Sequence, residues 1–150
     1  MNGPSPLILA LSLFTVAVCT LAFWKGGRAE RLGAAVILAN QGLTFLLTYV
    51  VGAKETGALA QLALDGVTAM ALLFVVLRFG SPWLGAAMLL YAGQFGLHSF
   101  YLVTERPNDW FHAVANNVIF LGVSLSLVTG VVLAWAKRAR AQPKVRVPGP

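Results

Sequence analysis

The chain has 150 residues, of which 58% are hydrophobic and 11% are charged, and its formal net charge is +6. This composition leaves no room for a soluble domain of useful size, and a single cysteine excludes a disulfide within the chain. The basic residues after Trp135 favour an orientation signal and contact with anionic lipid over nucleic-acid binding, because no aromatic side chain follows to stack on a base.

Five long runs without lysine, arginine or glutamate make up most of the chain: Met1–Trp24, Leu32–Ala53, Thr56–Leu77, Phe79–Thr104 and Trp110–Ala136. Each can supply the roughly 20 residues that an α-helix needs to cross a hydrocarbon core of about 30 Å. A closed barrel would instead show alternating polar and apolar residues. We predict an all-α integral membrane protein, a five-transmembrane-helix bundle with helices near 5–24, 32–52, 58–78, 83–104 and 111–136. Residues 1–136 then form one membrane domain, and 137–150 a basic, disordered cytoplasmic tail.

The first run is expected to stay in the mature protein as a membrane anchor. Residues Met1–Pro6 carry no basic side chain, and no small-x-small cleavage site follows, as a secretory signal would require. Cys19 lies within this run and is expected to be a small packing residue, because no neighbouring base is present to activate its thiol.

Basic residues predict the orientation of the helices. Nine Lys and Arg residues fall on the side of the first loop, the third loop and the C-terminal tail, whereas Lys54 and Arg106 fall on the other side. Because loops rich in Lys and Arg stay in the cytoplasm, we expect the C-terminus inside and the N-terminus outside, in the cell membrane and specifically a bacterial inner membrane. Tryptophans are then expected in the interfacial belts: Trp24, Trp83 and Trp135 inside and Trp110 outside.

The second and fourth runs begin alike, with Leu32-Gly33-Ala34-Ala35 and Leu84-Gly85-Ala86-Ala87, at an offset of 52 positions. The same offset pairs Asp65 with Asn117. This pattern suggests a tandem repeat of helix hairpins 2–3 and 4–5, related by a pseudo-two-fold axis along the membrane normal. Chance similarity between apolar, alanine-rich segments explains the match equally well.

Asp65 is the one charged residue inside an apolar run. If it capped a shorter helix, the thirteen residues Gly66–Arg78 would be too few to span the bilayer. We therefore expect Asp65 inside the membrane and facing the bundle interior, because an unpartnered carboxylate in lipid is costly. Polar residues recur at helical spacing and similar depth on the other helices. We expect a polar pocket, open to the outside, formed by Asp65, His98, Gln94, Asn116, Asn117, Gln41, Asn40 and Gln61.

Two roles are open for these residues. Asp65 and His98 can form a proton-accepting pair, which suits proton-coupled transport or contact with a quinone. Alternatively, the polar residues have a structural role and form hydrogen bonds between helices, each of which stabilises the bundle by about 0.6–2 kcal/mol. The match of Asp65 with Asn117 in the suggested repeat slightly favours the structural role. Two repeats that use Asp and Asn interchangeably need a hydrogen bond at this position more than a charge.

Neither haem nor a metal ion is expected as a cofactor. Ligation of haem by His98 and His112 is formally open, but no second histidine pair or haem-attachment motif accompanies them. A metal site needs three or four ligands, and Asp65 is the one further candidate beside the two histidines.

The fourth helix contains Tyr91-x-x-Gln94-Phe95-x-Leu97-His98-x-x-Tyr101, which resembles the translocator-protein family of tetrapyrrole and sterol binders. That family also has five helices in a chain of about this length. The resemblance covers a dozen residues, and the tryptophan- and proline-rich stretches of the family's first helices and loops are missing here. No site residue of the family is therefore transferred to this chain.

Two functional classes follow from these patterns. The first is a non-enzymatic membrane component, either a homo-oligomer or an accessory subunit of a larger complex. Its support is the small-residue ridge Gly122, Ser126 and Gly130, which permits close helix approach to a partner or within the chain. The second is a small transporter, or a protein that binds a quinone-like or tetrapyrrole-like ligand around Asp65 and His98. An enzyme ranks third, because no catalytic triad order, paired carboxylates or phosphate-binding glycine loop is present.

Overall fold

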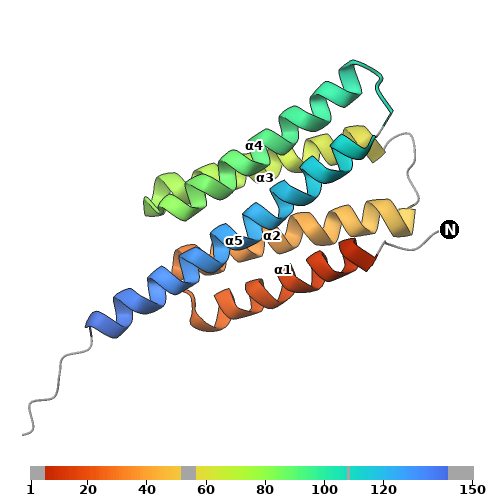
Figure 1. Cartoon of the computed structure of the whole chain (residues 1–150). Helices are drawn as coiled ribbons and strands as arrows, with labels where there is room; N and C mark the ends of the chain where they lie inside the picture. Colours follow the sequence, from red (N-terminus) through yellow and green to blue (C-terminus); the bar gives the residue numbers. More distant parts are fainter. Residues whose placement is uncertain (1–5, 52–56, 108, 142–150) are drawn as a thin grey trace, which may run out of the picture.

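The computed structural model describes residues 6–51, 57–107 and 109–141. Within these ranges the chain forms helices joined by short turns, which confirms the predicted all-α fold. The elements are α1 Pro6–Lys25, α2 Arg28–Phe45, its π-helical continuation η1 Leu46–Val51, α3 Gly57–Phe79, α4 Pro82–Val103 and α5 Trp110–Ala141. The helices run antiparallel, side by side, as one bundle (Figure 1).

Four helices are long and apolar enough to cross a membrane: α1, α2 with the start of η1, α3 and α5. By length and composition they fit the predicted multi-pass membrane protein. The remaining helix, α4, has 22 residues. Its second half contains the polar residues Gln94, His98 and Ser99.

The helices close into a ring, because each packs against its neighbours in the chain and α1 also packs against α5. The C-terminal ends of α1, α3 and α5 lie at the same end of the bundle as the N-terminal ends of α2 and α4 (Figure 1). We call this end the basic end, since it carries Lys25, Arg28, Arg31, Arg78, Lys137, Arg138 and Arg140. Lys54, expected at the opposite end, lies outside the described residues.

Two helix boundaries differ from the sequence prediction by more than one residue, and both lie at the basic end. α2 begins at Arg28, four residues before the expected start, because Glu30 caps it: the Gly27 backbone N–H donates to Glu30 Oε2 at 2.8 Å. α5 continues to Ala141, so residues 137–141 are helical and do not belong to a disordered tail. Basic side chains near a helix C-terminus interact favourably with its dipole, and the Arg138 guanidinium also donates to the Lys25 carbonyl.

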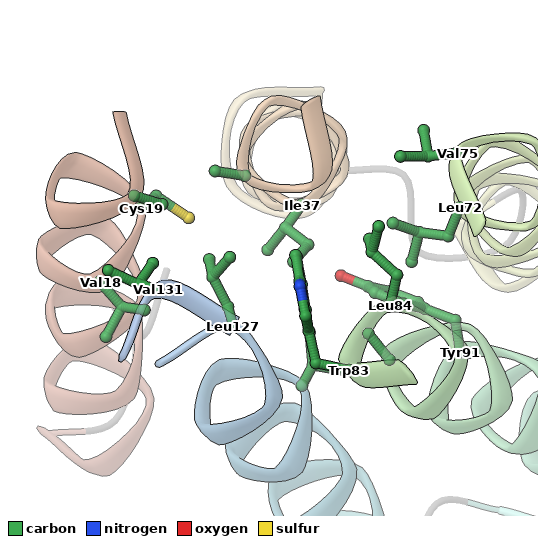
Figure 2. Close-up of a cluster of buried hydrophobic side chains, with 14 residues drawn as sticks. Val18, Cys19, Ile37, Leu72, Val75, Trp83, Leu84, Tyr91, Leu127 and Val131 are labelled. Carbon is green, nitrogen blue, oxygen red and sulfur yellow. The ribbon is translucent and has the colours of Figure 1, made fainter. Parts of the chain in front are cut away.

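Trp83 occupies the centre of the bundle at the basic end. Gly80, with φ of +61°, ends α3, and Pro82 begins α4 directly after the turn. The Trp83 side chain then enters between α2 and α5 (Figure 2), is 5% exposed, and donates from Nε1 to Glu30 Oε1 at 3.2 Å. The expectation of Trp83 in the interfacial belt was therefore wrong in part: it faces the protein interior, whereas Trp24, Trp110 and Trp135 are exposed.

Two glycines make room for this indole. A Cβ added to Gly33 of α2 would lie 2.7 Å from the Trp83 ring, and one added to Gly130 of α5 would lie 2.4 Å from it. Around the ring lie fully buried Ile37, Leu84 and Leu127. The core is therefore closely packed where these helices approach the tryptophan (Figure 2).

The small-residue ridge of α5 lies inside the chain. Gly130 contacts Trp83, and a Cβ added to Gly122 would meet the Leu90 side chain of α4 at 3.0 Å. Ser126, between them, donates its hydroxyl to the Gly122 carbonyl of its own helix. The ridge thus serves close packing of α5 against α4.

Candidate functional site

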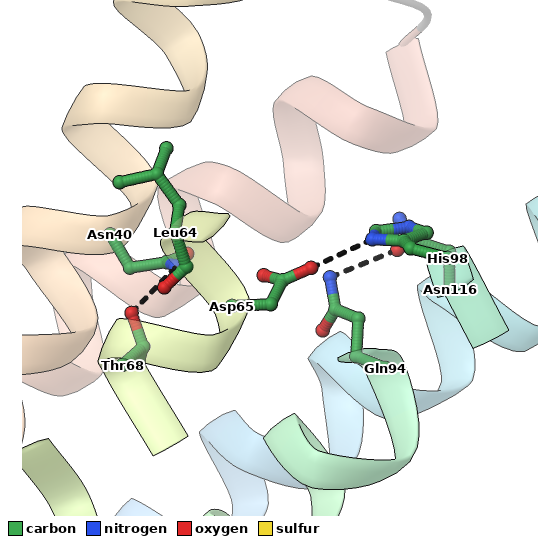
Figure 3. Close-up of polar contacts among 7 residues, drawn as sticks. All are labelled: Asn40, Leu64, Asp65, Thr68, Gln94, His98 and Asn116. Atoms are coloured by element: carbon green, nitrogen blue, oxygen red, sulfur yellow. Dashed lines mark hydrogen bonds and ion pairs between the residues drawn. The ribbon is translucent and has the colours of Figure 1, made fainter. Parts of the chain in front are cut away.

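Asp65 and His98 form a buried pair between α3 and α4. Asp65 lies about 12 Å along α3 from its N-terminus, at 1.5 Å per residue. Its Oδ2 is 2.7 Å from Nδ1 of His98, and the two side chains are 2% and 10% exposed, respectively (Figure 3). This is a carboxylate–imidazole hydrogen bond in the half of the bundle away from the basic end.

Further polar contacts flank the pair at similar depth. Asn40 of α2 donates from Nδ2 to Thr68 Oγ1 at 2.8 Å, next to Asp65 on α3. Gln94, one turn before His98 on α4, donates from Nε2 to Asn116 Oδ1 of α5 at 3.0 Å (Figure 3). Together with the Asp65–His98 bond, these bonds connect α2 to α3, α3 to α4 and α4 to α5. Four helices are therefore joined by hydrogen bonds around the pair.

Two residues of the predicted pocket, Gln41 and Asn117, lie away from this cluster, and a third, Gln61, lies beside it without taking part in its hydrogen bonds. Gln41 faces α1, where its Nε2 donates to the Ser12 carbonyl at 3.4 Å, and its buried Oε1 has no partner within the described residues. Asn117 lines a shallow apolar hollow with Leu7 and Leu11 of α1. Gln61 is half-buried, one turn from Asp65 toward the α3 N-terminus, and makes no hydrogen bond in the part of the chain described. The polar residues therefore form a central cluster and two separate contacts with α1.

A second group of polar side chains connects this cluster with the turn between α4 and α5. The imidazole rings of His98 and His112 lie 5.2 Å apart between centroids, and the His112 ring lies 4.7 Å from that of Tyr101. The Tyr101 hydroxyl donates to Asp109 Oδ1 at 2.7 Å. Asp109 is half-exposed and forms an ion pair with Arg106 at 2.9 Å.

Asp109 was not among the residues expected from the sequence, although a signal for it exists. It precedes α5, and its Oδ1 accepts the His112 backbone N–H at 2.9 Å, which is the geometry of an N-cap residue. The hydrogen bond from Tyr101, followed by the His112 N–H and the Arg106 guanidinium, holds the pKa of the Asp109 carboxyl below its ordinary value. An Asp directly before the apolar run that begins at Trp110 would have predicted this cap.

The histidine pair does not fit a haem. A macrocycle would have to lie between the rings of His98 and His112, but these rings are in direct contact, and His98 Nδ1 is engaged by Asp65. Among residues 6–51, 57–107 and 109–141, no three His, Cys, Asp or Glu side chains come together as metal ligands do. The Asp65–His98 contact can instead share one proton between a carboxylate and an imidazole, because an imidazole nitrogen can either donate or accept a hydrogen bond.

The segment of α4 that resembles translocator proteins lies at this site. Tyr91, Gln94 and Tyr101 are buried, and His98 joins them on the same face of the helix, toward α3 and α5. Helical periodicity alone accounts for this common face, since the four positions are spaced by three or four residues. The chain matches no protein-family model, no curated protein and no solved structure.

Proposed function

We propose that this protein is a small proton-coupled transporter of the bacterial inner membrane, which binds and releases a proton at the Asp65–His98 pair. The observation that carries the proposal is the 2.7 Å contact between a carboxylate and an imidazole that are both buried within the bundle. Ionisable residues inside membrane helices are costly, and those that occur commonly belong to ion pathways or proton relays.

The charge balance of the pair supports this role. With one shared proton the pair has no net charge, either as a carboxylate beside an imidazolium or as a carboxylic acid beside a neutral imidazole. With no proton or with two protons it has a unit charge in a medium of low dielectric constant. Because loss of the proton leaves the pair negative, proton release is favoured when a cation arrives or when the site opens to water, and a proton-coupled transporter uses such a linkage.

The proposal includes a topology of five spans. α4 is included because it runs antiparallel between two spanning helices and its polar side chains Gln94 and His98 bond to α5 and α3. The basic end faces the cytoplasm in this topology, because lysine and arginine are retained on that side. The N-terminus and the turn that holds Asp109 then face outside.

The alternative is an accessory subunit or a homo-oligomer in which Asp65 is structural. The ridge Gly122, Ser126 and Gly130, which suggested this class, packs against α4, so a partner would need another surface. The argument from the repeat also loses weight: Asp65 bonds to His98 of α4, whereas Asn117 lies in a hollow between α1 and α5. Asp65 and Asn117 therefore make different kinds of contact, which does not support an equivalent role in two repeats.

Infrared spectroscopy of the protein in lipid nanodiscs tests the site. We expect a carboxylic-acid band that grows on acidification, disappears in Asp65→Asn, and persists in Glu30→Gln. Glu30 is a matched control because it is a second buried carboxyl, bonded to Trp83 and Gly27 at the basic end. Melting temperatures of both variants establish that they fold. A spectrum of Asp65→Asn identical to that of the wild type would show that Asp65 does not exchange a proton.

Energised inside-out membrane vesicles test transport. A dye that reports the proton gradient is followed while sodium, potassium, ammonium and small organic ions are added in turn. We expect at least one of them to release protons in vesicles with the wild type and with Glu30→Gln, but not with Asp65→Asn. A folded Asp65→Asn protein that behaves as the wild type would support the structural alternative.

A further inference from the structure

We propose that protons reach Asp65 from the outer surface through the imidazoles of His112 and then His98, which Asp109 and Tyr101 hold in position. This inference deepens the proposed function and rests on it, since it names the route by which the Asp65–His98 pair gains and loses its proton.

The chain of contacts is continuous from the surface to the buried carboxylate. Asp109 accepts the Tyr101 hydroxyl at 2.7 Å. The Tyr101 ring meets the His112 ring edge-on at 4.7 Å, the His112 ring lies 5.2 Å from that of His98, and His98 Nδ1 lies 2.7 Å from Asp65.

Exposure falls from His112 to Asp65, and the exposed Arg106 and half-exposed Asp109 lie at the outer end, although Tyr101, which packs against His112, is itself buried. The side chains of Arg106 and Asp109 are 55% and 32% exposed, His112 is half-buried, and those of His98 and Asp65 are 10% and 2% exposed. A group that contacts water therefore lies at one end, and a group removed from water lies at the other.

Helix geometry explains why these side chains line up. His98 and Tyr101 are three residues apart on α4, and Asp109 and His112 are three residues apart at the start of α5, so each pair shares one helix face. The N-cap bond from Asp109 fixes the first turn of α5 and thereby the position of the His112 ring. Asp109 and Tyr101 are positioning residues in this scheme, and the two histidines transfer the proton.

An imidazole can pass a proton on because it has two nitrogens. In the inward direction, protonated His112 gives its proton to Nε2 of His98, directly or through one water molecule. His98 then gives the proton on Nδ1 to the Asp65 carboxylate. At the end both histidines are neutral, His98 carries its hydrogen on Nε2 in place of Nδ1, and Asp65 is a carboxylic acid, so one proton has moved inward.

Several other titratable or charged groups face this route. On α4, Tyr91 lies near Asp65, and on α1, Cys19 lies near Tyr91. Arg106 contacts Asp109 and stacks over Tyr101. The facing groups contributed by α2 and α5 are the neutral Asn40 and Asn116. Asp65 is therefore the one acidic acceptor described at the inner end of the route.

The rate of proton arrival at Asp65 tests the inference. The infrared band of Asp65 is followed after a rapid pH jump, with the protein in nanodiscs of phosphatidylethanolamine and phosphatidylglycerol. We expect His112→Gln to slow the response at least tenfold while the final amplitude of the band stays unchanged. Asn117→Ala is the matched control, because it removes a polar side chain of α5 that faces the α1 hollow instead.

Chemical rescue separates proton transfer from structural damage. We expect the infrared band of Asp65 to respond slowly to the pH jump in His112→Ala as well. Added imidazole should restore a large part of the wild-type response rate, because the free base can replace the missing ring. An unchanged rate in folded His112→Gln, with a normal Asp65 band, would overturn the route and leave the proposed function intact. Absence of any titrating Asp65 band in the wild type would instead contradict the proposed function.

Discussion

Gly130→Ala tests the packing of Trp83 between α2 and α5. The added methyl carbon would lie 2.4 Å from the indole, whereas nonbonded carbons prefer about 3.5–4.0 Å, so α5 or the ring must move by about 1 Å. The ring has no space on its other side, where a Cβ on Gly33 would lie 2.7 Å away. We expect the free energy of unfolding to fall by about 1–3 kcal/mol, as in other overpacked cores.

Unfolding in mixed detergent and dodecyl sulfate, followed by circular dichroism, measures this loss. Gly93→Ala is the matched control, because no atom lies within 4 Å of its added Cβ, and alanine is the better helix former by about 1 kcal/mol. The double variant Trp83→Phe with Gly130→Ala should lose less than the sum of the single changes, since a smaller ring relieves the clash. Equal stability of Gly130→Ala and Gly93→Ala would refute the packing argument.

Three further outcomes are expected. Thr15→Val breaks the buried 2.7 Å hydroxyl contact with Ser124 and should lower the free energy of unfolding by about 0.6–1.7 kcal/mol, while Thr20→Val on the exposed face of α1 should change it little. Because the folded-state pKa of Asp109 is lowered, its ionised form stabilises the fold above the ordinary value of 3.8, and this contribution is lost as the pH falls below that value. As the pH falls, the melting temperature of the wild type should therefore drop further than that of Asp109→Asn, whose amide can still cap the helix but has no proton to gain. A difference in melting temperature that stays constant from pH 7 to pH 3 would contradict this. If the C-terminus lies in the cytoplasm, a fluorescent protein fused to it should fluoresce and alkaline phosphatase fused to it should be inactive. The reverse pattern would refute the topology.

The existence of the helices could be predicted because long runs with few charged residues have the length and composition of membrane-spanning helices. Their ends depend on local chemistry that hydropathy ignores. Glu30 starts α2 early by capping Gly27, and the basic residues at 137–140 prolong α5 without being apolar. Hydropathy also does not distinguish a tryptophan at the interface from one inside. Trp83 is buried because Gly33 and Gly130, far away in sequence, leave space for it.

The candidate site could be predicted in part for a similar reason. Periodicity places Asp65 on one face of α3 and Gln94 and His98 on one face of α4, but the rotation of each helix about its axis decides which faces meet. Gln41 and Asn117 are at a comparable depth, yet their helices turn them toward α1. Asp109 lies in a turn, where no helical period marks it.

The position of His98 on the helix that follows Asp65 has a consequence for biogenesis. When α3 leaves the ribosome its carboxylate has no partner, and insertion of an unpaired Asp near the middle of the membrane costs about 2.5–3.5 kcal/mol on the translocon scale. The partner arrives on α4, after a turn of only Gly80 and Ser81. In the proposed five-span topology, entry of α3 and α4 as one hairpin would let the 2.7 Å contact form as the helices enter the lipid. Residues after Ser81 would then help to determine whether the segment before Gly80 becomes a membrane helix.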